Sequence, residues 1–376
     1  MREYMLCLFA AAAVTYFLTP PVRALALRWG IVAPVRDRDV HDTPTPRLGG
    51  LAMAGGLLTG LLLASKLPMM SSVFEGSNVV IALLSGAAII IVLGIVDDKW
   101  GLDAPTKLAG QVLAAGVMAF QGIAIIWLPI GGTLVLDPLT SVLFTVIIVV
   151  VSINAINFVD GLDGLAAGIV AVAAGAFFVY AYLLSVDLGL ERATLATLVS
   201  VLLVGMGLGF LPNNLFPARI FMGDTGSMLL GLLLAAATIT LSGQVDPSAL
   251  SGGAFLPTLL PLILPFAVMA LPLVDLGLAV IRRTRAGRNP FAPDKQHLHH
   301  RLLEMGHSQR RAVFLMYAWT ALIAGAALAI AFFPLIYAGI GTAIGVVIMV
   351  FLVRRTPPKS AVNQVESQRG PIGRIG

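Results

Sequence analysis

Two adjacent carboxylates, Asp97 and Asp98, stand at the end of a strongly apolar run over residues 76–96. If this run is a helix, both acids lie at its C-terminus, where the macrodipole is negative and each acid costs about 0.3–1 kcal/mol. Two solvated acids are therefore a poor explanation of the pair. Because neighbouring helical residues point about 100° apart, one carboxylate can face a phosphate or a metal ion while the other engages a second group.

Four oxygen-bearing side chains recur at every third position of the segment NAINFVDGLDGL, namely Asn154, Asn157, Asp160 and Asp163. Acids at a helix start and Asp-Gly pairs are ordinary capping and turn residues, so Asp160 and Asp163 alone would indicate only a turn. A turn needs one or two such side chains, and the run of four favours a ligand site.

Asp224 lies in the small-residue segment GDTGS, where an aspartate is also an acceptable helix cap. The glycines let a ligand approach the backbone closely, and amides at a helix start suit a phosphate. Phe221 offers either a face for base stacking or a membrane anchor, and Asn214 shares the same loop.

Three of the five histidines, His297, His299 and His300, lie together in a basic segment that includes Arg301. Zinc binding is one interpretation, but no cysteine is near and the surrounding cations would repel a dication. Contact with anionic lipid explains some of the basic residues. An anion site, in which imidazole and guanidinium groups grip a diphosphate, explains the histidines better.

These segments together combine hard oxygen ligands, which suit Mg²⁺, with a basic grip for anions. Phosphoryl transfer needs such parts, because it depends on positioning and on neutralising charge around an in-line displacement.

The composition shows what kind of element must position these residues. Of 376 residues, 58% are hydrophobic and 11% are charged, with a mean hydropathy of +0.94. Soluble domains carry about a quarter charged residues, so a water-soluble globular protein is excluded. Cys7 is the only cysteine, which excludes a disulfide-stapled ectodomain. The net charge of +5 is better explained by membrane topology than by a nucleic-acid partner.

A helical span needs about 20 apolar residues, and the long apolar run that contains Pro334 is read as two spans. The predicted fold is therefore an all-α polytopic membrane protein of about eleven transmembrane helices. The apolar runs are 4–22, 48–65, 76–96, 108–136, 138–159, 164–186, 193–218, 225–245, 247–274 and 312–353. The segment 127–137 is either a short hairpin, turning at its Gly-Gly pair, or a plain loop.

Lys and Arg fix the orientation. With the N-terminus outside, the inner loops and the tail hold 21 of the 24 Lys and Arg residues. The C-terminus is then cytoplasmic. Residues 1–355 form one integral membrane domain, and 356–376 form a polar tail that we expect to be disordered.

Every cluster described above falls on an inner loop or helix end under this topology, which predicts one active site at the cytoplasmic face. A transporter is the alternative of another class, and it would place ionisable groups near the middle of the bilayer. Only Asp275 lies well inside a span, and it is close enough to the inner face to belong to the same site. The membrane location suggests that one substrate is a lipid phosphate.

Five ordered motifs resemble those of the polyprenyl-phosphate N-acetylhexosamine-1-phosphate transferase family, a glycosyltransferase family 4 group, over about residues 1–355. They are DTPTPRLGG, the Asp pair of VDDKWGL, NAINFVDGLDGL, FMGDTGS and HLHHRL. The resemblance implies transfer of a sugar 1-phosphate from a UDP-sugar to undecaprenyl or decaprenyl phosphate, with release of UMP. It also implies Mg²⁺ as the cofactor, with Mn²⁺ as a substitute, a bacterial cytoplasmic membrane, and a first step in a cell-envelope glycan.

By motif position, the resemblance assigns Asp97 and Asp98 to activation of the lipid phosphate, with Asp97 as base or nucleophile, and Lys107 to holding phosphate. It assigns Asp224 to the metal, with Asn157 beside it. The residues expected at the uridine are Asp160, Gly161, Leu162, Asp163, Asn214 and Phe221. Those expected at the sugar diphosphate are His297, His299, His300 and Arg301, with the three histidines counted as catalytic. Two further residues, Arg47 and Asn154, are expected to bind substrate.

The forms HLHHRL and TPRLGG are similar to the branch that uses UDP-GlcNAc. The alternative branch is the phospho-MurNAc-pentapeptide transferase of peptidoglycan synthesis, which usually shows another histidine pattern. Family members can also be homodimers, and a single sequence leaves this open.

Overall fold

The computed structural model describes residues 1–33, 44–75, 78–128, 134–187, 193–244, 302 and 305–355, together with the isolated positions 277, 281, 284 and 285. Within these ranges the chain is a bundle of long apolar helices. Their bounds are α1 (Arg2–Arg28), α2 (Gly49–Ala64), α4 (Val79–Trp100), α5 (Ala104–Phe120), α6 (Pro138–Val159), α7 (Leu165–Asp187), α8 (Ala193–Asn214), α9 (Gly223–Gln244), α13 (Gln309–Phe332) and α14 (Leu335–Arg354).

Short elements join these helices. A 3-10 turn η1 (Pro68–Met70) and α3 (Ser71–Phe74) follow α2. Strands β1 (Val32–Ala33) and β2 (Thr45–Pro46) pair antiparallel, as do β3 (Trp127–Leu128) and β4 (Leu134–Val135). The second pair confirms the hairpin interpretation of this segment. It also corrects the predicted run 108–136, because the helix in that run ends at Phe120.

Ten of the predicted spans correspond to a helix of the structure, and the remaining one, 247–274, lies outside the described residues. In the described part of the chain, eight helices are long and apolar enough to cross a membrane, or nine if the bent pair of α2 with η1 and α3 counts as one span. The break at Pro334 is confirmed, since this residue caps α14. The structure therefore agrees with a polytopic all-α membrane protein.

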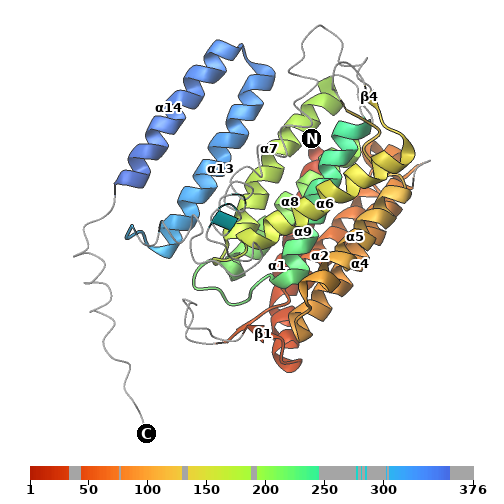
Figure 1. The fold of residues 1–376 in the computed structure, drawn as a ribbon, viewed down its shortest axis with the longest axis vertical. Coiled ribbons are helices and arrows are strands. Elements are labelled where there is room, and N and C mark those ends of the chain that lie inside the picture. Colours follow the sequence, from red (N-terminus) through yellow and green to blue (C-terminus); the bar gives the residue numbers. More distant parts are fainter. Residues whose placement is uncertain are drawn as a thin grey trace.

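Helix α9 is the centre of the bundle and is almost wholly buried. It packs against α2, α4, α6 and α8. Figure 1 shows α13 and α14 as a pair at one side of the bundle next to α7, with α4 and α5 at the other side. The first turn of α9 is thus enclosed by the ends of other helices, and this is where the polar residues gather.

Close backbone contacts hold that first turn in place. A Cβ atom added to Gly94 of α4 would lie 2.3 Å from Cα of Thr225, and one added to Gly50 of α2 would lie 2.2 Å from the backbone nitrogen of Gly226. Small residues at such crossings let helix backbones approach closely in membranes. The start of α9 therefore has no freedom to shift toward α2 or α4.

Candidate active site

Asp98 caps the start of α9 from a different helix. Its Oδ1 accepts the backbone N–H of Asp224 (2.8 Å), and its Oδ2 accepts the backbone N–H (3.1 Å) and the hydroxyl (2.7 Å) of Thr225. The carboxylate is unfavourable at the end of its own helix, and the positive end of the α9 dipole compensates for it. Two of the α9 amides that could suit a phosphate are thus occupied by Asp98.

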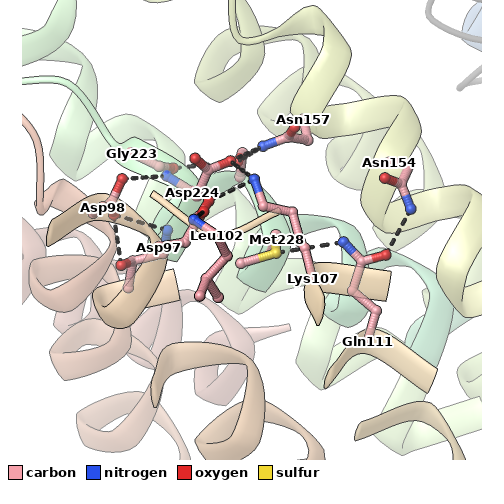
Figure 2. A network of polar contacts seen from close by, with 12 residues as sticks. Asp97, Asp98, Leu102, Lys107, Gln111, Asn154, Asn157, Gly223, Asp224 and Met228 are labelled. Carbon is pink, nitrogen blue, oxygen red and sulfur yellow. Dashed lines mark hydrogen bonds and ion pairs between the residues drawn. The ribbon is translucent and has the colours of Figure 1, made fainter. Parts of the chain in front are cut away.

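Asp97 points the other way, into a cluster with Lys107 and Asp224 (Figure 2). The Lys107 ammonium group lies 2.5 Å from Oδ2 of Asp97 and 3.2 Å from Oδ1 of Asp224. The other oxygen of Asp97 accepts the backbone N–H of Leu102 at 2.7 Å. The two neighbouring aspartates thus have separate partners, as the 100° rotation between them predicted.

Local sequence explains why Lys107 is in this position. Gly101 ends α4 with φ of +70°, which glycine adopts readily. Asp103 then caps α5, accepting the backbone N–H of Thr106 at 3.1 Å. Helix α5 therefore starts at Ala104, and Lys107 faces back toward the end of α4 from its first turn.

Polar residues of α6 extend the cluster. The side-chain amide of Asn157 donates to Oδ1 of Asp224 and to the Ser227 hydroxyl (2.9 Å). Asn154, one turn earlier, donates to Oε1 of Gln111 at 2.7 Å. Asn157 is thus placed beside Asp224, as predicted, and Asn154 lies farther along the same network.

Gln111 was not among the predicted residues. It lies one turn after Lys107 on α5, is 1% exposed, and contacts both Asn154 and the sulfur of Met228 (3.5 Å). The sequence signal that could have found it is a glutamine four residues after a lysine in an otherwise apolar helix. Polar groups at membrane depth are costly and face the interior of a bundle, so such a glutamine is expected to lie on the same face as Lys107.

The turn between α6 and α7 holds the next predicted residues. Asp163 is buried and accepts the backbone N–H of Ala218 at 2.9 Å. Asn214 is also buried, accepting the backbone N–H of Gly164 (3.1 Å) and donating to the carbonyl of Ile220 (3.0 Å). Asp163 and Asn214 therefore tie the turn to the loop after α8, while Gly161 is exposed and Leu162 is buried in the same turn.

Asp160 is half-buried at the end of α6. Burial raises its pKa to about 8, together with the negative charges of Asp224 and Asp98, while the positive charge of Arg47 opposes the shift. Asp160 is thus close enough to Arg47 and to Asp224 for their charges to affect its ionisation. An excess of negative charge in this region favours a bound cation.

Arg47 and Phe221 meet through their backbones. They form an isolated parallel bridge, and the backbone N–H of Phe221 donates to the carbonyl of Pro46 at 2.8 Å. The carbonyl of Phe221 in turn accepts the backbone N–H of Gly49 at 3.0 Å. The motif that carries Arg47 is thereby joined to the loop that leads into α9.

The donor set of this cluster fits a loosely held magnesium ion. In the described residues, no group of three or more His, Cys, Asp or Glu side chains is close enough to hold a metal on its own. Mg²⁺ commonly takes only one or two carboxylates and completes its shell with water and substrate phosphates. Asp97 and Asp224 supply two carboxylates around a single positive charge. Oδ2 of Asp97 is matched by the positive charge of Lys107.

Four of the five predicted motifs therefore meet at one end of the bundle. In the fifth motif, His297, His299, His300 and Arg301 lie outside the described residues, as does Asp275. The polar cluster lies at helix ends and not midway along the spans, which argues against a transporter with a relay at the centre of the membrane.

Comparison with known proteins relates this geometry to a family. The model of glycosyl transferase family 4 matches residues 80–242. A decaprenyl-phosphate N-acetylglucosaminephosphotransferase of Mycolicibacterium smegmatis is 47% identical over 95% of this chain and 90% of its own length. The protein of the same description from Mycobacterium tuberculosis is also 47% identical, over 89% of this chain and 84% of its own. A Bacillus subtilis protein described as a probable undecaprenyl-phosphate N-acetylglucosaminyl 1-phosphate transferase is 31% identical over 84% of this chain and 82% of its own.

Proposed function

This chain belongs to glycosyl transferase family 4, and from that premise we infer that it is a polyprenyl-phosphate N-acetylglucosamine-1-phosphate transferase. The observation that carries the inference is the 47% identity, over 95% of the chain, to an enzyme named for this transfer. The cluster of Asp97, Lys107 and Asp224 supports it, because phosphoryl transfer depends on carboxylates and cations held in fixed positions.

The donor in this proposal is UDP-GlcNAc. The acceptor is decaprenyl phosphate, the lipid in the names of the mycobacterial relatives. An oxygen of the lipid phosphate forms a bond to the β-phosphorus of the donor, and the bond from that phosphorus to the bridging oxygen breaks. The electron pair leaves with UMP, and the lipid product is polyprenyl-diphospho-GlcNAc.

The end of the bundle that carries the site faces the cytoplasm in this proposal. The asymmetry of Lys and Arg along the sequence supports it. The alternation of long helices brings the ends of α4, α6 and α8 and the starts of α5, α7 and α9 to the same side, so one orientation applies to all of these motifs. The protein would then be a multi-pass protein of the bacterial cytoplasmic membrane.

Mg²⁺ is the proposed cofactor, with Mn²⁺ as a substitute, and Asp224 and Asn157 would hold it. When bound, the ion neutralises negative charge on the diphosphate as that charge develops on the leaving oxygen. The Asn157 amide nitrogen now donates to Asp224. Rotation of the amide by half a turn would present its oxygen instead, and the two orientations are nearly indistinguishable by shape.

The remaining side chains divide into groups that face substrate and groups that position them. Asp97 acts on the lipid phosphate as a general base or serves as a nucleophile. Lys107, whose ammonium group lies between Asp97 and Asp224, would hold a phosphate oxygen. Asp98 holds the start of α9. His297, His299, His300 and Arg301 grip the diphosphate.

Release of UMP by purified enzyme in detergent tests this function. We expect UMP and a lipid of the mass of polyprenyl-diphospho-GlcNAc when UDP-GlcNAc and decaprenyl phosphate are supplied. UDP-GalNAc and UDP-MurNAc-pentapeptide should give little product. Product from UDP-MurNAc-pentapeptide alone would move the chain to the peptidoglycan branch, and a transporter would release no UMP from any donor.

Removal of divalent metal is expected to abolish this activity. EDTA should reduce UMP release to background, and added Mg²⁺ or Mn²⁺ should restore it, because the carboxylate cluster then regains its counter-charge. Full activity in EDTA, after dialysis against chelator, would remove the metal from the proposal.

The close contact of α4 with the start of α9 gives a further test. Gly94→Ala should lower kcat by about 100-fold, because a Cβ there pushes the first turn of α9, and with it Asp224, by a fraction of an ångström to an ångström. Gly116→Ala in α5 is the matched control, since a Cβ at that position meets no atom within 4 Å. Equal kcat values for the two variants would show that the position of this turn does not limit turnover.

A further inference from the structure

Helix α13 reaches the site end of the bundle with two polar side chains. The Tyr317 hydroxyl donates to the carbonyl of Gly164, and Nε of Arg310 donates to the carbonyl of Phe216 at 3.0 Å. Gly164 ends the turn after α6, and Phe216 lies in the loop after α8. A helix distant in sequence thus contacts both loops that carry nucleotide-binding candidates.

Gly164 is held on both sides of its peptide backbone. Its φ is +77°, in the left-handed region that favours glycine. Its N–H is accepted by Oδ1 of Asn214, and its carbonyl accepts the Tyr317 hydroxyl. Together with the bond from Ala218 to Asp163, these contacts leave the turn 160–164 few ways to move, and Tyr317 supplies the only one among them that comes from α13.

The ring of Tyr317 also requires a special position on α7. A Cβ atom added to Gly168 would lie 2.0 Å from Cζ and 2.3 Å from Cε1 of the ring. The ring therefore lies directly on the backbone of α7, one turn after Gly164. The space that Gly168 leaves for the ring is called the packing notch. The notch and the hydrogen bond both hold the Tyr317 hydroxyl at the carbonyl of Gly164.

We propose that Tyr317 is a positioning residue for the nucleotide, which sets the geometry of the turn 160–163 by anchoring the carbonyl of Gly164. This inference rests on the proposed function and on the expectation that Asp160, Gly161, Leu162 and Asp163 bind the uridine. Helix α13 begins at Gln309, shortly after Arg301 in the sequence. The helix that carries Tyr317 is therefore continuous in the chain with the histidine-rich segment. Tyr317 itself touches no substrate.

The test is a comparison of Tyr317→Phe with Tyr337→Phe. Tyr317→Phe removes one hydroxyl and keeps the ring, and we expect KM for UDP-GlcNAc to rise roughly five- to tenfold, the effect of losing one hydrogen bond, while kcat changes less than twofold. Tyr337, on α14, is 68% exposed and should leave both constants at the wild-type values. The increase in Tm caused by UDP-GlcNAc should be smaller in Tyr317→Phe at the same concentration, because stabilisation follows affinity.

A double-mutant cycle tests the packing notch. Gly168→Ala should raise KM by displacing the ring, whereas Gly168→Ala combined with Tyr317→Ala should be no worse than Tyr317→Ala alone, because the clash is then gone. Additive effects would show that Gly168 acts independently of Tyr317.

The outcomes separate this inference from the function on which it rests. If wild-type enzyme releases UMP and Tyr317→Phe has an unchanged KM with a lowered Tm, Tyr317 is only structural and the inference is wrong. If wild-type enzyme neither releases UMP nor gains Tm with UDP-GlcNAc, the proposed function itself fails.

Discussion

Asp224→Asn is expected to lower kcat for UMP release by about 1000-fold or more, because a metal-bound carboxylate contributes several kcal/mol of charge stabilisation and each 1.4 kcal/mol is a tenfold change in rate. The substitution keeps the size of the side chain and its contacts with Lys107 and Asn157. The loss should therefore appear in turnover, measured in purified enzyme at saturating Mg²⁺ and both substrates.

Asp137→Asn is the matched control for this variant. Asp137 caps the opposite end of α6, where it accepts the backbone N–H groups of Leu139 and Thr140. Asparagine is an equally good cap, so the activity of Asp137→Asn should equal that of the wild type. Activity of Asp224→Asn within a factor of ten of this control would remove Asp224 from the metal site.

Asp97→Asn and Asp98→Asn are expected to lower activity for different reasons, although the two residues are adjacent: the first through the chemistry and the second through stability. Asp97 faces Lys107, so Asp97→Asn should lower kcat by about 100- to 10,000-fold, the range of general acid–base catalysis. Its Tm should fall by less than that of Asp98→Asn, because Asp97 accepts one backbone amide and Asp98 accepts two and a hydroxyl. Asp98 binds two backbone amides and a hydroxyl at the start of α9. Hydrogen bonds to charged groups contribute about 1.5–3 kcal/mol each, so Asp98→Asn should lower Tm clearly.

The activity of Asp98→Asn should also fall, because α9 carries Asp224 directly after the capped position. Thr225→Val separates the two effects, since it removes only the hydroxyl that donates to Asp98. We expect Thr225→Val to lower Tm by less than Asp98→Asn and to keep most of the activity. Wild-type Tm with full activity in Asp98→Asn would contradict the assignment of this residue to the α9 cap.

Much of the site could be predicted from the sequence, because it is built from short local motifs. The acid pair of α4, the asparagines of α6 and the GDTGS segment each carry a polar pattern that apolar helices do not need. Once the spans alternate in direction, their ends must fall on one of two sides, so gathering of these motifs at one end follows from topology. The structure confirms this convergence for the motifs within the described residues.

The partners of individual side chains could not be predicted in the same way. In the sequence, Asp97 and Asp98 are an adjacent pair with no sign of different partners. Only the packing of the helices shows that Asp98 binds two backbone amides of α9 and that Asp97 pairs with Lys107. Gln111 looks like an isolated polar residue until α5 and α6 are placed together. Tyr317 and Gly164 lie far apart in the chain, and no local pattern links them.

The sequence by itself determined the class of this protein, its helices and the kind of chemistry. It could do so because hydropathy sets the spans and because local motifs record which residue types a phosphate or metal site needs. The tertiary structure decided which carboxylate is a structural cap, which faces the lysine, and which helix supports the nucleotide turn. The physical reason is that hydrogen bonds and ion pairs act over about 3 Å, a separation that depends on helix rotation and approach, and these are fixed only by contacts such as Gly94 on Thr225 and Gly168 on Tyr317.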